Sequence, residues 1–203
     1  MEHTNNQITL RGTLVNLPEF SHENHGRRFY RFYLEVPRLS GTVDILPVIA
    51  EKQILNEIDL SGGLMLTVEG QVRTHNSRLD GVRRLLIFVY AQHITADDGE
   101  PINDVLLSGP LCKEPVYRRT PLGRDICDVM LAVPRGFHRA DYLPCILWGR
   151  TAQEISACSV RDEVQIKGRL QSRVYTKVSD EGTEERIAYE ISALTAQILE
   201  SEN

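Results

Sequence analysis

Leu34-Glu35-Val36-Pro37-Arg38 returns 97 residues later in the chain as Leu131-Ala132-Val133-Pro134-Arg135. At the same offset, the 40 positions from Leu10 to Ile49 align without a gap on a second stretch and share 14 identical residues. The shared residues are mostly apolar residues, glycines and prolines, which govern the path of a chain more than its surface. A self-match at one offset indicates a repeated structural unit. We therefore interpret the chain as one unit written twice.

The length agrees with this interpretation, since 203 residues correspond to one large domain or two small ones. We predict a first copy over residues 1–96 and a second copy over residues 104–203. Between them lies Asp97-Asp98-Gly99-Glu100-Pro101, a polar segment with Gly and Pro that is typical of an exposed linker.

Each copy has mostly the pattern of β-strands. In the second copy, apolar residues and Gly168 alternate with polar residues between Val164 and Leu170, and this period of two predicts a strand with one buried face. One helical pattern interrupts the strands of each copy, over residues 51–59 and 150–158. The order β-β-β-α-β-β is that of the OB-fold, a small barrel whose strands and loops bind oligonucleotides. The sequence therefore predicts an all-β protein of two tandem OB-fold five-stranded barrels, each with one short helix between strands 3 and 4.

The composition excludes several classes of protein. No run of about 18 apolar residues exists, so neither a membrane span nor a membrane partner is predicted. Residues 1–7 are polar and unlike a secretory signal, and we expect a cytoplasmic protein with reduced thiols. The four cysteines form no CxxC pair, and the sequence has no nucleophile elbow, Walker loop or dinucleotide fingerprint. We therefore expect no metal, no cofactor and no enzymatic activity.

A series of motifs runs through the second copy in a fixed order: 105–111 (VLLSGPL), 120–124 (TPLGR), 131–133 (LAV), 142–149 (YLPCILWG), 168–175 (GRLQSRVY) and 189–193 (YEISA). In order and spacing, these motifs resemble the bacterial single-stranded DNA-binding protein family. The resemblance covers nearly all of the second copy, whereas the first copy matches only the skeleton. It implies a tandem version of that family, with two OB domains in one chain, that binds single-stranded DNA in replication, repair or recombination.

The resemblance also implies a set of base-stacking residues, because the family binds single strands on a few aromatic side chains. Four of its positions hold an aromatic residue here: Phe137, Tyr142, Trp148 and Tyr175. The spacing along the chain is consistent with such a set, since Tyr142 and Trp148 are six residues apart and share one face of their strand. Stacking together with a basic groove binds single strands of any sequence. We therefore predict sequence-nonspecific binding by the four aromatics and by basic residues near them, Arg135, Lys167, Arg169 and Arg173.

The first copy departs from this pattern at all four positions, which hold Ser40, Ile45, Glu51 and Ser77 or its neighbour. We interpret it as a degenerate copy that lacks the stacking aromatics. Phe29, Arg31 and Tyr33 lie on the face of their strand opposite the predicted core. These three residues predict either an interface with another domain or subunit or an auxiliary contact with nucleic acid, and we favour the interface.

The charge is divided unevenly between the copies. The net charge of the whole chain is -5, which taken alone argues against a partner as acidic as nucleic acid. Residues 105–178, however, carry 12 Lys and Arg against 7 Asp and Glu, whereas residues 8–94 carry 10 against 9. The acidic excess lies in the linker and in residues 179–203. The second copy is therefore a basic unit, as phosphate binding requires.

Two other functions stay open at this point: an RNA-binding OB protein, and a tandem-OB module that binds other proteins of the replication and restart machinery. The aromatic set favours nucleic acid over protein, and the preference for DNA rests on the resemblance. The family commonly assembles four OB domains, so two per chain imply a homodimer. Its members usually end in a flexible tail with an acidic tip. Residues 199–203 show no such linker and tip, so tail-mediated recruitment of partner proteins is not predicted.

Overall fold

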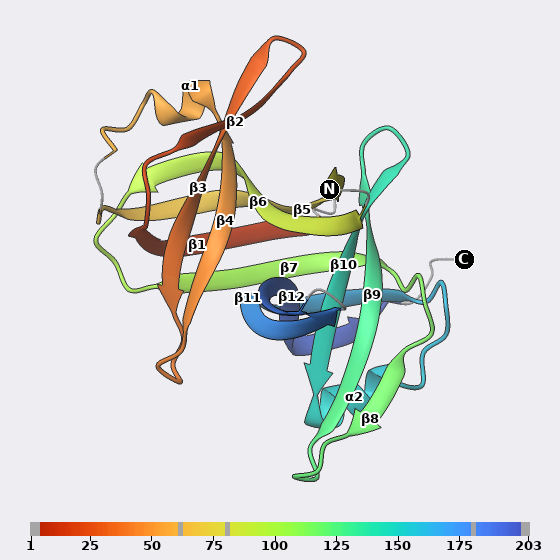
Figure 1. The fold of residues 1–203 in the computed structure, drawn as a ribbon. Helices are drawn as coiled ribbons and strands as arrows, with labels where there is room; N and C mark the ends of the chain where they lie inside the picture. Colours follow the sequence, from red (N-terminus) through yellow and green to blue (C-terminus); the bar gives the residue numbers. More distant parts are fainter. Residues whose placement is uncertain (1–4, 61–62, 80–81, 180–181, 200–203) are drawn as a thin grey trace.

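The computed structural model describes residues 5–60, 63–79, 82–179 and 182–199. Strands make up most of the chain, which confirms the predicted all-β fold (Figure 1). The described part of the first copy contains β1 (Asn6–Leu14), β2 (Glu19–Asn24), β3 (Arg27–Pro37), β4 (Val43–Glu51), α1 (Lys52–Leu55), β5 (Met65–Leu79) and β6 (Val82–Ala96). The second copy repeats this order with β7 (Ile102–Pro110), β8 (Val116–Arg119), β9 (Asp125–Arg135), β10 (Arg139–Trp148), α2 (Gly149–Ile155), β11 (Glu163–Ser179) and β12 (Gly182–Ile198).

Each copy has one strand more than the sequence predicted. β2 pairs with the edge of β3, and β8 with the edge of β9, so each helix follows the fourth strand of its copy instead of the third. Every residue of β2 and β8 is exposed, and neither strand therefore shows the alternation that marks a half-buried strand. The helices are also shorter than predicted, because the chain enters turns directly after Leu55 and Ile155.

The two copies are joined through one sheet by antiparallel pairing of β1 with β7. Ile8 lies opposite Val105, and these residues are each other's equivalents at the offset of 97. A pseudo-twofold axis therefore passes through this pair. The strand order β2-β3-β4-β6-β5-β1-β7-β11-β12-β10-β9-β8 accordingly places equivalent strands at equal distances from the centre.

Each barrel closes where its first strand meets its third. Leu14 lies opposite Leu34 in the first copy, and Leu111 lies opposite Leu131 at the equivalent place in the second. Glycine is required where the strands cross closely. A Cβ added at Gly168 would collide with the carbonyl oxygen of the facing strand, beside the bulge in the β11–β12 ladder. The alternating apolar side chains fill the inside of both barrels.

Two buried aspartates fasten the copies to each other. Asp44 of the first copy accepts hydrogen bonds from the backbone N–H of Ser172, at 2.7 Å, and from its hydroxyl, at 2.9 Å. Asp141, the equivalent of Asp44, accepts hydrogen bonds from the N–H of Thr74, at 2.7 Å, and from its hydroxyl, at 3.1 Å. Each aspartate also binds an arginine of its own copy, and each side chain is 1% exposed. Both ends of the junction between the copies therefore have the same arrangement: a buried aspartate that binds an arginine of its own copy and a Ser or Thr of the other copy.

Candidate nucleic-acid interface

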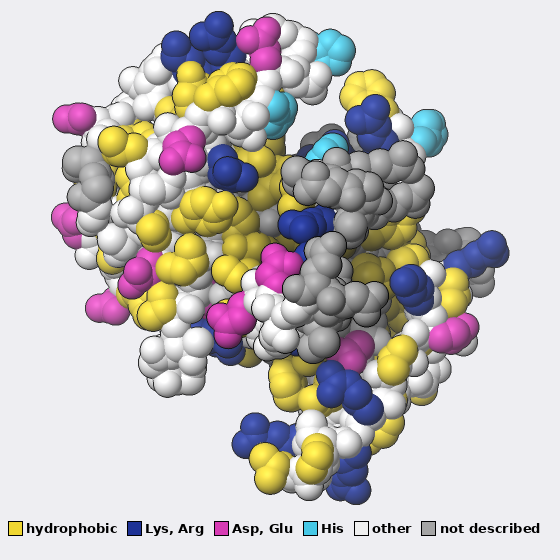
Figure 2. All heavy atoms as spheres, viewed as in Figure 1, with side chains coloured by type: hydrophobic (Ala, Val, Ile, Leu, Met, Phe, Trp, Pro, Cys, Tyr) yellow, Lys and Arg dark blue, Asp and Glu magenta, His cyan; other side chains and the backbone are white. Residues whose placement is uncertain are grey.

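The β9–β10 hairpin carries three of the four predicted aromatics. Phe137 stands at its tip and is 96% exposed. Phe137 and His138 both have left-handed backbone conformations, with φ of 61° and 54°. Such a conformation is uncommon for a bulky residue and costs on the order of 1–3 kcal/mol, and strain of this kind concentrates at functional sites. Figure 2 shows hydrophobic and basic side chains together at this tip.

Tyr142 and Trp148 lie near the two ends of β10 and both reach solvent. They are 48% and 39% exposed, whereas Leu143 and Leu147 between them point into the barrel. Gly149, with φ of 56°, turns the chain into α2 directly after Trp148. The indole therefore stands at the end of β10, directly before the turn into α2.

Tyr175 comes to the same face through the register of three strands. Ile146 of β10 lies opposite Ser192 of β12, and Ser192 lies opposite Arg169 of β11. Residues that lie opposite each other in a sheet point to the same side, and so do residues an even number apart along one strand. Tyr175, six residues after Arg169, therefore shares the face of Ile146 and of the β10 aromatics. It is 36% exposed, and the guanidinium of Arg173 lies 5.8 Å from its ring centre.

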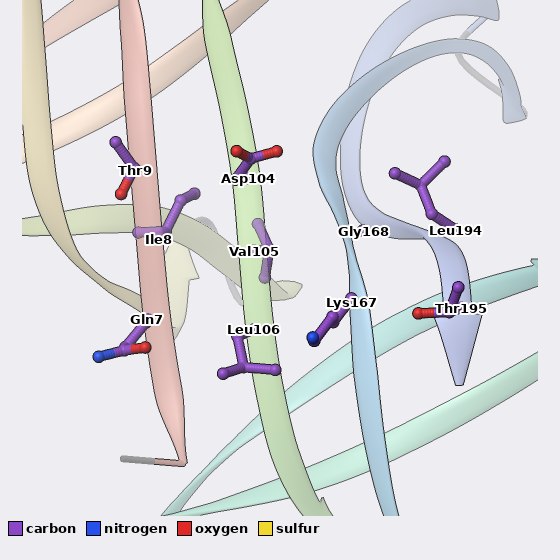
Figure 3. A pocket seen from close by; sticks show the side chains of 10 residues that line it. All are labelled: Gln7, Ile8, Thr9, Asp104, Val105, Leu106, Lys167, Gly168, Leu194 and Thr195. Atoms are coloured by element: carbon purple, nitrogen blue, oxygen red, sulfur yellow. The ribbon is translucent and has the colours of Figure 1, made fainter. Parts of the chain in front are cut away.

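The four predicted basic residues do not all join the aromatics. Arg169 and Arg173 lie on the aromatic face of β11. Lys167, two residues before Arg169, has the same orientation on β11 but lies where this strand pairs with β7, and it lines a groove that β11 forms with β7 and β1 on the outer side of the central sheet (Figure 3). Arg135 lies at the junction of the copies, where its Nη1 is 3.2 Å from Oδ1 of Asp141. The structure thus brings two of the four basic residues together with the aromatics.

In the first copy, an ion pair lies on the face that corresponds to the aromatic face of the second copy. Glu51 occupies the position of Trp148 and accepts a hydrogen bond of 2.8 Å from Nε of Arg27. The hydrogen bond from Arg27 lowers the pKa of Glu51, so this carboxyl group stays charged at neutral pH. A carboxylate neither stacks on a base nor attracts a phosphate. The first copy therefore offers no stacking surface at this position.

Phe29 is buried, although the sequence placed it on an exposed face with Arg31 and Tyr33. The ring of His22 stacks on Phe29 with 4.8 Å between ring centres, and Phe29 is 6% exposed. His22 belongs to β2, the strand that the sequence did not predict, so nothing in the local pattern indicated this cover. Arg31 is exposed and lies 5.9 Å from the ring centre of Tyr33. The predicted interface or auxiliary contact now depends on Arg31 and Tyr33.

The described ranges offer neither a metal site nor a membrane-spanning helix. They contain no group of three or more His, Cys, Asp or Glu side chains arranged to hold a metal ion. Burial raises the pKa of Cys127 to about 11, so its thiol stays protonated near neutral pH. None of the helices in these ranges has the length and apolar character needed to cross a membrane.

Comparison with known proteins connects this geometry to a family. The sequence model described as the Single-strand binding protein family matches residues 102–199. The structure of the wild-type single-stranded DNA binding protein from Thermus aquaticus matches 98% of this chain and 94% of its own, with a TM-score of 0.80 and 23% sequence identity. That likeness extends over both copies and shows the shared fold.

Two curated relatives carry the sequence similarity. Single-stranded DNA-binding protein B of Bacillus subtilis (strain 168) is 39% identical over 80 residues, which are 36% of this chain and 71% of that protein. The single-stranded DNA-binding protein of Bacillus cereus is 32% identical over 111 residues, which are 50% of this chain and 62% of that protein. With this similarity and the matched fold, the chain belongs to the single-strand binding protein family.

Proposed function

We propose that this protein binds single-stranded DNA without sequence preference, in replication, repair or recombination, and that it acts as a binding protein and not as an enzyme. The observation that carries this proposal is the face on which Tyr142 and Trp148 of β10 lie with Arg169, Arg173 and Tyr175 of β11, connected through β12. The relatives are named single-stranded DNA-binding proteins, which favours DNA over RNA. Because bacteria handle their DNA in the cytoplasm, we also propose a cytoplasmic location.

This face suits a single strand because it engages what all nucleotides share. Every base has a π-face, and its stacking on an aromatic side chain is worth about 1–3 kcal/mol. The hairpin tip, the two ends of β10 and β11 supply the rings, namely Phe137, Tyr142, Trp148 and Tyr175. Arg169 and Arg173 bring positive charge to the phosphates between the stacked bases. Stacking does not discriminate between bases, so the binding is independent of sequence.

We assign the stacking to the second of two OB domains, residues 104–203. The first, residues 1–96, is in this proposal a copy that has lost the stacking residues. The Arg27–Glu51 ion pair at the position of Trp148 supports the assignment, because it replaces an aromatic ring by a fixed negative charge.

Trp148 is the only tryptophan, so its fluorescence reports on the proposed site. We expect oligo(dT) to quench this fluorescence to saturation, with an affinity that falls as salt rises because phosphate binding releases counterions. Duplex DNA of the same length is the control and should give little quenching. Competition by oligo(U) compares RNA with DNA in the same assay. The absence of both quenching and an anisotropy change of labelled oligo(dT) would contradict the proposal and favour a protein-binding module.

We further propose that two chains form a homodimer with four OB domains. The outer face of the central sheet has a groove of about 470 Å³, and its lining includes Leu106 of β7, Lys167 of β11 and Leu194 of β12 (Figure 3). Leu194 protrudes from the bulge of β12 and is 67% exposed. In a dimer with twofold symmetry the same patch of both chains meets, so the two grooves would face each other.

Light scattering tests this assembly. We expect a mass of twice the 23.0 kDa chain, and we expect Leu194→Glu to shift the mass toward one chain because it places a charge in the contact. Glu57→Gln, at an exposed position of the first copy, is the control and should keep the wild-type mass. A single-chain mass for the wild-type protein would refute the homodimer.

A further inference from the structure

A small polar pocket lies at the junction of the copies, beside the hairpin that carries Phe137. Its volume is about 230 Å³. The first copy lines it with Asn5, Gln71 and Arg73, and the second copy lines it with Arg135 and Gly136. Two arginines from different copies therefore face one cavity.

The two arginines share a single carboxylate. Nη1 of Arg73 lies 3.0 Å from Oδ2 of Asp141, and Nη1 of Arg135 lies 3.2 Å from Oδ1. The same carboxylate already accepts the N–H and the hydroxyl of Thr74. Two positive charges against one negative charge leave the pocket with a net charge of +1. The pocket is therefore suited to an anion.

Both guanidinium groups retain donors for such an anion. A guanidinium has five N–H donors. In the described ranges, Arg135 has Asp141 as its hydrogen-bond partner, and Arg73 has Asp141 and Gln71. The side chain of Arg73 is 21% exposed and that of Arg135 is 31% exposed, so both can be reached from the pocket while the junction stays folded.

The opposite end of the junction shows that the second arginine is not needed to join the copies. There Asp44 binds Arg38 and Ser172, and the position equivalent to Arg73 holds Gln171. One arginine then faces one aspartate, and Gln171 donates a hydrogen bond of 2.9 Å to Glu190. The hairpin next to this end carries Ser40 at the position of Phe137. The surplus arginine thus occurs only at the end that also carries the exposed aromatic tip.

We propose that Arg73 and Arg135 form a phosphate subsite that holds the backbone of the strand stacked on the second copy. The inference rests on the proposed function and deepens it, because the first copy then contributes a binding residue through Arg73. The strand leaves the aromatic face at Phe137, and the next negative charge enters the pocket at the base of the same hairpin. The ligand is the phosphodiester of the bound DNA itself.

Arg73→Gln is the sharpest test, because it reproduces the residue found at the opposite end of the junction. The binding of labelled oligo(dT) is measured by anisotropy over a series of salt concentrations. One lost phosphate contact should reduce the slope of log K against log salt by about 0.7, and this corresponds to an affinity about fivefold lower at about 0.1 M salt. The quenching of Trp148 at saturation should stay at the wild-type value, since the stacked bases are unaffected.

Arg28→Gln is the matched control, because it removes the same charge from the exposed β2–β3 hairpin of the first copy. It should leave the salt slope at the wild-type value. Urea unfolding checks that Arg73→Gln keeps the junction intact. If the wild-type protein binds and Arg73→Gln has an unchanged slope, or if Arg28→Gln lowers the slope equally, the subsite is refuted. If the wild-type protein does not bind at all, the proposed function itself fails.

Discussion

We expect the double substitution Tyr142→Ala, Trp148→Ala to lower the affinity for oligo(dT) by at least about 30-fold. Each ring contributes about 1–3 kcal/mol of base stacking, and the two side chains are far enough apart along β10 for their contributions to add. The sum of at least about 2 kcal/mol corresponds to this loss of affinity. Anisotropy of labelled oligo(dT) measures the effect, because the variant has no tryptophan. The salt slope stays at the wild-type value, since the arginines that hold the phosphates remain.

Phe20→Ala is the control for this result. Phe20 is an aromatic residue of the first copy that is 59% exposed, on a strand outside the proposed face. It should leave the affinity within about twofold of the wild-type value, since no base stacks on it. Wild-type affinity in the double variant, or an equal loss in Phe20→Ala, would show that the aromatic face of β10 is not where the bases stack.

We expect Asp44→Ala to destabilise the protein by about 3–5 kcal/mol. Removing this carboxylate leaves the guanidinium of Arg38, 16% exposed, without its charge partner, and leaves two donors of Ser172 unpaired at the junction. The loss of one partner of a buried ion pair typically costs this much. Urea unfolding at neutral pH measures the difference. Asp59→Ala, at an exposed position, should change the free energy of unfolding by less than about 0.5 kcal/mol.

Acid should remove from the wild-type protein the stabilisation that the Asp44 carboxylate provides. Burial raises the pKa of Asp44, but the hydrogen bonds from Arg38 and Ser172 outweigh this effect and lower the pKa below its ordinary value of 3.8. A carboxyl group with a lowered pKa in the folded protein stabilises it above the ordinary pKa and loses this effect as pH falls through the lowered value. The gap in unfolding free energy between wild type and Asp44→Ala should therefore narrow below about pH 3.8. A constant gap down to strongly acidic pH would contradict the ion pair.

Local patterns predicted the elements whose residues alternate between core and solvent. The strand around Val164 to Leu170 was predicted because its apolar residues follow the pleat, and the structure buries them. β2 and β8 were missed because an edge strand that is exposed on both faces has no such alternation. Phe29 was predicted to be exposed because β2 was not predicted: the ring of His22 that covers Phe29 belongs to that strand.

The sequence by itself determined the repeat, the all-β class and the strand faces on which Tyr142, Trp148 and Tyr175 stand. These features depend on identity between the copies and on a period of two, and both can be read along the chain. Only the tertiary structure decided that Arg135 lies against Asp141, that Lys167 lies in the outer groove and that Arg73 joins the second copy. Arg135 and Asp141 are six residues apart and meet within the β9–β10 hairpin. The positions of Lys167 and Arg73 depend on strand register and on the pseudo-twofold axis through Ile8 and Val105, which bring together residues more than 60 positions apart. No local periodicity carries that information.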